Sequence, residues 1–119
     1  MPKIPFRSQT PNPMNPNVIE VTVEDVFACK SGVCIVDVRE HDEWIGELGH
    51  IAEAKLLTLG SLPNELSQIP QDEVVVFVCR SGARSARATA FAKQSGYEHV
   101  FNMKGGMLEW NKCNLPVTK

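Results

Sequence analysis

Cys79 lies where several residue types that support chemistry meet in this sequence. It follows an apolar, β-branched stretch at residues 74–78, and a helix is expected to begin close behind it, over residues 85–95. A loop that enters a helix presents unpaired backbone N–H groups and the positive end of the helix dipole. Both features favour a bound anion, and they favour a thiolate over a thiol. We therefore predict that Cys79 is a nucleophile at a strand-to-helix turn.

The residues that follow Cys79 suit the binding of an anion. Gly82 lets the backbone curl without a Cβ clash. Arg84 brings a fixed positive charge and a planar fork that matches an oxyanion, and Ser85 could cap the helix. A lone cysteine would be better interpreted as a small buried hydrophobic residue. Here a cysteine, a glycine, a serine and two arginines, Arg80 and Arg84, share one turn, which favours chemistry over packing.

Strands that alternate with short helices must position this turn. Runs of β-branched and apolar residues predict strands near 18–21, 33–38, 54–57, 73–78 and 100–102. Helical patterns lie near residues 22–30, 40–48, 62–66, 85–95 and 107–112. This alternation predicts an α/β fold with a central, mainly parallel sheet of about five strands flanked by helices. In such sheets ligands bind at the carboxyl ends of strands, which is where Cys79 falls.

The length of 119 residues fits one domain, and 43% hydrophobic with 22% charged residues is ordinary for a globular protein. Residues 1–17 hold five prolines together with several asparagines. Proline removes a backbone donor and interrupts helices. We therefore expect a Pro/Asn-rich N-terminal tail over residues 1–17, extended or laid over the surface, and one domain over residues 18–119.

Charge and cysteine spacing exclude several classes of function. A net charge of −2 argues against a nucleic-acid partner. The longest apolar run, residues 74–79, is too short to span a membrane, and the N-terminus shows no secretory signal. The four cysteines lack the paired spacing of a zinc site, so we expect no metal and reduced thiols. These features predict a cytoplasmic protein, expected to be a monomer, with no membrane partner.

Beyond these patterns, the chain resembles the rhodanese-like sulfurtransferases over residues 18–117. The matching pieces are residues 37–40 (Asp-Val-Arg-Glu), residues 49–51 (Gly-His-Ile), the loop of residues 79–84, and Gly105-Gly106 with Trp110. The sequence departs from the family pattern at Ala52 and Glu53, where proline and glycine are usual. The resemblance implies a rhodanese-like fold with a parallel sheet. It also implies that Cys79 accepts a sulfane sulfur as a persulfide and passes it to a nucleophile.

The family's six-residue loop maps onto residues 79–84, which we call the Cys79 loop: Cys79, Arg80, Ser81, Gly82, Ala83 and Arg84. The resemblance implies that the last five bind the donor, that thiosulfate or a persulfide is that donor, and that cyanide, a thiol or a protein thiol is the acceptor. No cofactor is needed. Asp37 and Arg39 are interpreted as a structural ion pair near the site rather than as substrate contacts. Lys104 could attract an anionic donor or simply be solvated.

Two other functions fit the same residues. Cysteine phosphatases, some of which share this fold, place five residues between the cysteine and the arginine, whereas four separate Cys79 from Arg84. The shorter loop makes a smaller cradle, which suits a sulfur atom better than a phosphoryl group. A non-catalytic binding module on the same fold is the other alternative, because a fold alone does not imply an activity.

Overall fold

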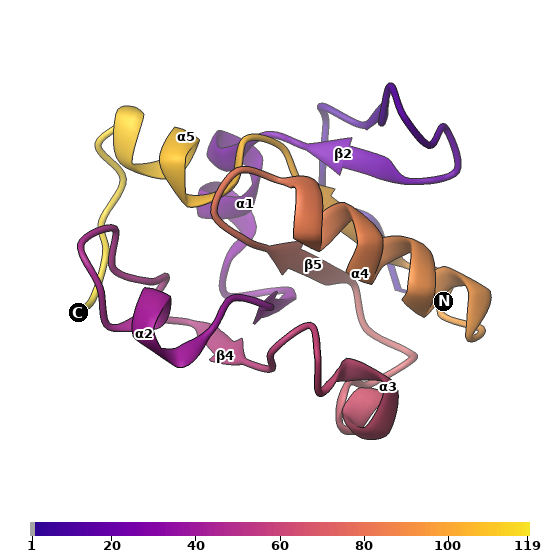
Figure 1. Ribbon diagram of the computed structural model, residues 1–119. Helices are drawn as coiled ribbons and strands as arrows, with labels where there is room; N and C mark the ends of the chain where they lie inside the picture. The colour runs from indigo at the N-terminus through magenta and orange to yellow at the C-terminus, as the bar shows by residue number, and fades with distance from the viewer. Residues whose placement is uncertain (1) are drawn as a thin grey trace.

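Figure 1 shows the computed structural model, which describes residues 2–119. One six-stranded sheet has the order β1-β2-β6-β5-β3-β4, with bounds Thr10–Pro11 (β1), Ile19–Val21 (β2), Cys34–Asp37 (β3), Ala54–Leu56 (β4), Val75–Val78 (β5) and Val100–Met103 (β6). All neighbouring strands from β2 to β4 are parallel, and β1 alone is antiparallel to its neighbour. The prediction of an α/β fold with a mainly parallel sheet is confirmed.

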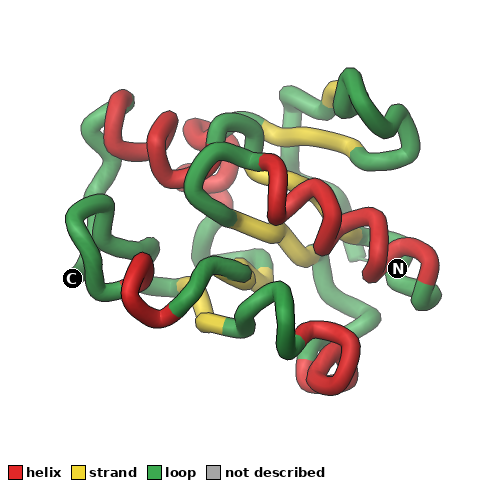
Figure 2. The backbone as a smooth tube through the Cα atoms, viewed as in Figure 1, coloured by secondary structure: helices red, strands yellow, loops and turns green. Residues whose placement is uncertain are grey.

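Helices cover both faces of the sheet and join most of the strands, with bounds Val23–Cys29 (α1), His41–Trp44 (α2), Leu62–Glu65 (α3), Ala83–Gln94 (α4) and Gly106–Lys112 (α5), and a 3-10 turn at Leu66–Gln68. Figure 2 shows α4, the longest helix, running beside the central strands. Thr22 caps α1, with its hydroxyl oxygen accepting from the backbone N–H of Asp25 over 3.2 Å.

The sheet holds one strand more than the five expected, because part of the Pro/Asn-rich N-terminal tail, called the lead-in below, joins it. β1 spans Thr10–Pro11 and pairs with β2 at the edge of the sheet. Proline lacks the N–H of a ladder donor, and it is tolerated on an edge strand for that reason. A two-residue strand with a proline shows no alternating apolar pattern, so the sequence does not predict it.

The lead-in before β1 packs closely on the domain. Phe6 is only 5% exposed, and its ring meets the ring of Phe101 edge-to-face at 5.3 Å. The backbone N–H groups of Arg7 and Ser8 both donate to Asp25 Oδ2 over 2.9 Å. Burial raises the pKa of Asp25, but a hydrogen bond from the Ser8 hydroxyl over 2.6 Å and the two from these N–H groups outweigh burial, and the pKa ends below its ordinary value. The lead-in is therefore anchored to β6 by an apolar contact and to α1 by hydrogen bonds to the Asp25 carboxylate.

Two hydrophobic cores lie on opposite faces of the sheet, and the alternation of side chains along β5 divides between them. Val76 and Val78 join the core beneath α1 and α5, which also contains Trp110. Val75 and Phe77 join the core beneath α4, which Cys79 shares. The strand therefore fixes the face on which the cysteine lies: it is the face covered by α4.

The helix predicted over residues 40–48 ends at Trp44, so its second half was wrong. The chain turns there to bring Gly49 beside the C-terminal segment, and His50 N donates to the Thr118 carbonyl over 2.8 Å. Gly49 has a φ of +64°, and a Cβ at this position would lie 2.8 Å from the Thr118 carbonyl oxygen. The His50 ring stacks on Trp44 at 3.7 Å, and its Nδ1 pairs with the Trp44 carbonyl. These contacts hold α2 in place beside the sheet.

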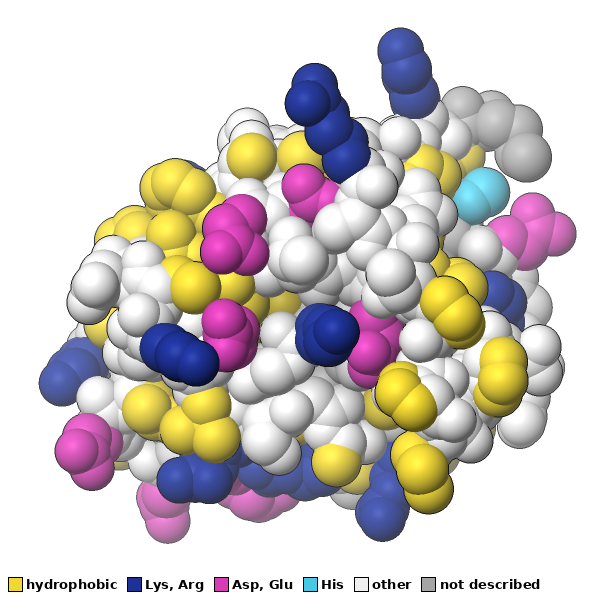
Figure 3. Space-filling view, turned by 90° about the horizontal axis from the view of Figure 1, so that it is seen from above, with side chains coloured by type: hydrophobic (Ala, Val, Ile, Leu, Met, Phe, Trp, Pro, Cys, Tyr) yellow, Lys and Arg dark blue, Asp and Glu magenta, His cyan; other side chains and the backbone are white. Residues whose placement is uncertain are grey.

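Figure 3 shows one face of the molecule, on which the described acidic and basic side chains are interspersed. Because the two signs are mixed, the described side chains on this face do not form a large area of one charge. Within residues 2–119, each helix is too short or too polar to cross a bilayer.

Candidate active site

Cys79 directly follows β5, which lies between β3 and β6 in the middle of the sheet. The cysteine is 1% exposed. Its Sγ accepts a hydrogen bond from the Gly82 backbone N–H over 3.1 Å and lies 3.2 Å from the Ser85 hydroxyl oxygen. Two donors therefore converge on one sulfur atom at the carboxyl edge of a parallel sheet. Such donors stabilise a thiolate more than a neutral thiol.

The first turn of α5 shapes the Cys79 loop. Met107 N donates to the carbonyl of Cys79 over 2.8 Å, and Leu108 N donates to the carbonyl of Arg80 over 3.0 Å. Gly106 permits this approach, since it has a φ of +59° and a Cβ there would lie 2.5 Å from both carbonyl oxygens. A trans peptide points its N–H away from its C=O. Because the carbonyls of Cys79 and Arg80 are directed at α5, the N–H groups of the same two peptide bonds, those of Arg80 and Ser81, point to the opposite side of the loop.

Gly82 makes the transition from the loop to α4. It is the N-cap of α4 and adopts a φ of +105°, which favours glycine. Ser85 is not the cap that the sequence suggested: the helix begins at Ala83, so Ser85 already lies in its first turn. From there its hydroxyl faces the sulfur instead of a backbone N–H. The structure thus adds a side-chain contact to the cysteine that the sequence did not predict.

The guanidinium of Arg84 pairs with Glu43 of α2. Its Nη1 and Nη2 donate to the two carboxylate oxygens over 2.7 and 2.8 Å. Hydrogen bonds from Arg84 lower the pKa of Glu43 to about 2, against the opposing effect of burial. The same hydrogen bonds raise the pKa of Arg84 still further. The fork that the sequence assigns to the donor therefore binds a carboxylate of the protein itself.

Asp37 and Arg39 form a buried ion pair at the end of β3, and both side chains are 1% exposed. Arg39 Nε and Nη2 donate to the Asp37 carboxylate over 2.9 and 2.7 Å. Its other N–H groups donate to the carbonyls of Gly49 and Glu43. The guanidinium thus ties the strand to α2 at Glu43 itself and to Gly49 in the turn that follows the helix.

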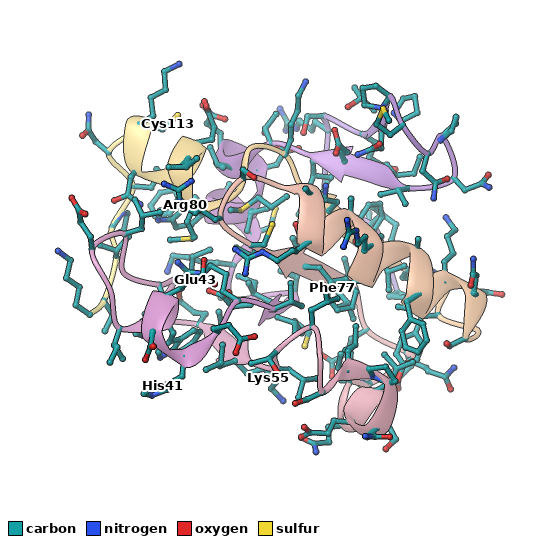
Figure 4. The ribbon with its side chains drawn as sticks, viewed as in Figure 1. His41, Glu43, Lys55, Phe77, Arg80 and Cys113 are labelled. Atoms are coloured by element: carbon teal, nitrogen blue, oxygen red, sulfur yellow. The ribbon has the colours of Figure 1, made fainter. Side chains whose placement is uncertain are left out.

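The remaining predicted residues lie in different places. Arg80 is exposed and lines a hollow of about 430 Å³ beside the loop, together with Glu43, Glu47 and Leu108. Figure 4 shows Arg80 and Glu43 at this hollow, one from the loop and one from α2. Ser81 and Ala83 are exposed on the loop. Lys104 lines a separate hollow of about 330 Å³, to which no residue of the Cys79 loop contributes.

Three polar residues of this region were missed by the sequence analysis. They are Glu43, Asn102 and Glu20, and the last two are buried. Asn102 interrupts the apolar strand β6, and Glu20 lies between two apolar residues of β2. A polar residue inside a strand that is otherwise buried needs a hydrogen-bonding partner. The sequence therefore did indicate that Asn102 and Glu20 need partners. Within the described part of the chain, no group of three or more His, Cys, Asp or Glu could hold a metal ion.

Comparison with known proteins gives a consistent assignment. The family model described as rhodanese-like domain matches residues 23–113. A protein named sulfurtransferase from Allochromatium vinosum is 42% identical over 85 residues, which cover 71% of this chain and 78% of that protein. The thiosulfate sulfurtransferase GlpE of Vibrio cholerae is 30% identical over 99 residues, covering 83% of this chain and 92% of that protein.

Solved structures agree with the sequence comparisons. The crystal structure of a rhodanese-related protein from Thermoplasma volcanium superposes with a TM-score of 0.78 at 26% identity, covering 83% of this chain and 96% of that one. The chain therefore belongs to the rhodanese-like domain family, and its fold is the rhodanese-like fold.

Proposed function

We propose that this protein is a sulfurtransferase that moves a sulfane sulfur from thiosulfate or a persulfide donor to a thiophilic acceptor through a persulfide on Cys79. One observation carries the proposal: the Cys79 sulfur lies at the N-terminus of α4 and faces both the Gly82 N–H and the Ser85 hydroxyl. This environment suits a thiolate nucleophile. The kinship with proteins named sulfurtransferase gives the reaction its class.

In the first step, the Cys79 thiolate attacks the outer sulfur of thiosulfate. A bond forms between Sγ and that sulfur, the donor S–S bond breaks, and its electron pair leaves with sulfite. The outer sulfur keeps the negative charge that it carries in thiosulfate and becomes the anionic end of the new persulfide. The N–H groups of the Cys79 loop that point away from α5 are the donors for that charge.

In the second step, an acceptor takes the outer sulfur. Cyanide or a thiolate attacks it, the bond to Sγ breaks, and the electron pair returns to Sγ. Cyanide gives thiocyanate, and a thiol gives a new persulfide. The two steps share one covalent intermediate, so the kinetics should be ping-pong. No metal or organic cofactor takes part in either step.

Donor binding is assigned to the five residues that follow Cys79 in the loop. The backbone of Arg80, Ser81, Gly82 and Ala83 supplies N–H groups, and the exposed Arg80 lines the hollow beside the loop, where its charge can attract an anion. Arg84 would reach a donor only by leaving Glu43. We further propose that the protein works as a monomer in the cytoplasm, where a reducing environment keeps its four free cysteines as thiols.

Phosphate-ester hydrolysis and a purely binding role are the alternatives that an experiment must separate from sulfur transfer. Initial rates of thiocyanate formation, measured at several fixed cyanide concentrations with thiosulfate varied, test the proposal. Parallel double-reciprocal lines are expected for the wild type, and Cys79→Ser should form no thiocyanate. Hydrolysis of p-nitrophenyl phosphate without sulfur transfer would support a phosphatase instead. The absence of both reactions would support a binding module.

A further inference from the structure

Buried polar side chains connect Cys79 to β6 and β2. Ser85 Oγ lies 3.2 Å from Cys79 Sγ and 2.5 Å from Asn102 Oδ1. Asn102 Nδ2 in turn donates to Glu20 Oε2 over 2.9 Å and to the Gly82 carbonyl oxygen over 3.1 Å. Ser85 and Asn102 are fully buried, and Glu20 is 7% exposed. The sulfur-transfer steps described above give Asn102 and Glu20 no task, and they do not say what the Ser85 hydroxyl does when sulfur leaves Cys79.

The neighbours of Asn102 fix the orientation of its amide group. Its Nδ2 faces a carboxylate oxygen and a carbonyl oxygen, and neither of these can donate a hydrogen bond. The other end of the amide, Oδ1, therefore faces Ser85 and can only accept. A serine hydroxyl has one hydrogen. That hydrogen has two possible acceptors on the two sides of the Ser85 oxygen: Asn102 Oδ1 and Cys79 Sγ.

The charge on sulfur decides between these two acceptors. In a neutral thiol or a persulfide, Sγ carries no charge and is a weak acceptor, so the hydroxyl donates to Asn102. In the thiolate, Sγ is charged, and a hydrogen bond to an ionised acceptor is roughly twice as strong as one between neutral groups. Rotation about the Cβ–Oγ bond moves the hydrogen from Oδ1 to Sγ while the oxygen stays in place. The donor is thus in position before the charge develops.

We propose that Ser85 is a further catalytic residue, which donates to Cys79 Sγ in both steps of sulfur transfer, and that Asn102 and Glu20 are its positioning residues. The inference rests on the proposed sulfur transfer and deepens it. When the acceptor takes the outer sulfur, the electron pair of the breaking S–S bond remains on Sγ, and the Ser85 hydroxyl stabilises it. Glu20 Oε2 also accepts from Asn12 Nδ2 over 2.7 Å, so the lead-in completes this arrangement.

The first test does not depend on sulfur transfer. Iodoacetamide labelling of Cys79, resolved by peptide mass spectrometry, is measured at about pH 6 and about pH 9 in the wild type and in Ser85→Ala. The variant should label about ten-fold more slowly at the lower pH, because the thiolate has lost one of its two donors, and nearly normally at the higher pH. Equal ratios of the two rates in both proteins would overturn the role of Ser85.

A matched variant controls for the loss of a buried hydroxyl from α4. Thr89 lies one helical turn after Ser85, is fully buried, and donates to the Ser85 carbonyl over 2.7 Å. Thr89→Val removes this hydroxyl at nearly constant shape, and it should keep the wild-type ratio of labelling rates. If Thr89→Val changes that ratio as much as Ser85→Ala does, general loosening of the helix explains the effect and the proposal fails.

The positioning role has its own test. Glu20→Ala should slow labelling at about pH 6 in the wild-type background but have no further effect when Ser85→Ala is also present, because Glu20 acts through Ser85. Glu20→Gln keeps an acceptor oxygen for Asn102 and should restore labelling to within about two-fold of the wild type. Unchanged or faster labelling in Glu20→Ala, or additive losses in the double variant, would overturn the positioning role.

A last measurement connects the residue to sulfur transfer. Enzyme loaded with thiosulfate is mixed with cyanide, and the single-turnover release of thiocyanate is followed in the wild type and Ser85→Ala. Release should be about ten-fold slower in the variant. Equal release rates from equally loaded proteins would contradict the catalytic role of Ser85. Failure of the wild type to load would instead contradict the proposed function, whatever the labelling ratios are.

Discussion

Arg84 and Glu43 face each other through two parallel hydrogen bonds, from Nη1 to Oε1 over 2.7 Å and from Nη2 to Oε2 over 2.8 Å. The pair joins the first turn of α4 to α2 at the border of the Cys79 loop. Arginine and carboxylate forks match in geometry, and the thiosulfate oxygens would need the same fork. A donor anion that uses Arg84 must therefore compete with Glu43.

This competition predicts that Glu43→Gln improves the use of thiosulfate. The amide no longer holds the guanidinium with a full charge, and a partly exposed pair of this kind is worth up to about 1 kcal/mol. The kcat/KM for thiosulfate should rise by up to about five-fold. A fall in kcat/KM would show that Glu43 supports the loop and does not compete with the donor.

Arg84→Ala should impair an anionic donor more than a neutral one. Loss of a charge-assisted hydrogen bond costs about 1.5 to 3 kcal/mol, or roughly ten- to a hundred-fold in rate. The backbone N–H groups of the loop remain, so a neutral trisulfide should still load Cys79. The measurement is kcat/KM for both donors. Equal losses for the two donors would leave Arg84 with the structural role that its contact with Glu43 already suggests.

The same pair predicts a dependence of stability on pH. Arg84 lowers the pKa of Glu43 from its ordinary 4.5 to about 2. The stabilisation is therefore fully present above about pH 4.5 and is lost as the pH falls towards about 2. Because both side chains are partly exposed, the loss should be about 1 kcal/mol. Urea unfolding at about pH 5 and about pH 3 measures it.

Glu43→Gln is the control for this pH dependence, since it cannot titrate. Its free energy of unfolding should fall less between the two pH values than that of the wild type. Asp25, whose pKa hydrogen bonds from Ser8 and Arg7 also lower, contributes equally to both proteins and cancels in the comparison. Identical pH dependence in the two proteins would contradict the assigned ion pair.

Cys79 should differ from Cys34 and Cys113 in how its alkylation depends on pH. Burial raises the pKa of Cys34. Burial and the carboxylates of Glu24 and Glu109 raise that of Cys113. Cys79 has donors around its sulfur instead. The ratio of its iodoacetamide rate at about pH 6 to that at about pH 9 should therefore be higher than the same ratio for Cys34 or Cys113. Both rates are measured on the same cysteine, so their ratio does not depend on how accessible that cysteine is to the reagent. A higher ratio at Cys34 or Cys113 than at Cys79 would contradict the account.

The position of Cys79 follows from local patterns. The β-branched run before it predicts a buried strand, and the alanine-rich segment behind it predicts the helix, so the loop between them falls at the carboxyl edge of the sheet. Both elements are confirmed as β5 and α4. A turn of this kind needs only neighbouring residues to be recognised.

Contacts between distant residues were not predictable in the same way. Glu43 meets Arg84 across 41 positions and Glu20 meets Asn102 across 82. The spacing of Glu43 and Arg84, or of Glu20 and Asn102, does not distinguish these pairs from other possible pairs of acidic and polar residues on the same elements. Their pairing depends on which strands become neighbours, here β2 beside β6, and that order is a property of the whole sheet. A polar residue within a buried strand shows that a partner is needed, but not which one.

The central claim is that Cys79 carries the transferred sulfur, and mass measurement tests it most directly. Purified protein is incubated with thiosulfate, its intact mass is measured, and the modified peptide is mapped, with Cys79→Ser as the control. We predict a gain of one sulfur atom on Cys79 that cyanide removes, and no gain in the variant. A sulfur atom mapped to Cys29, Cys34 or Cys113, or a wild-type protein that gains none, would contradict the account.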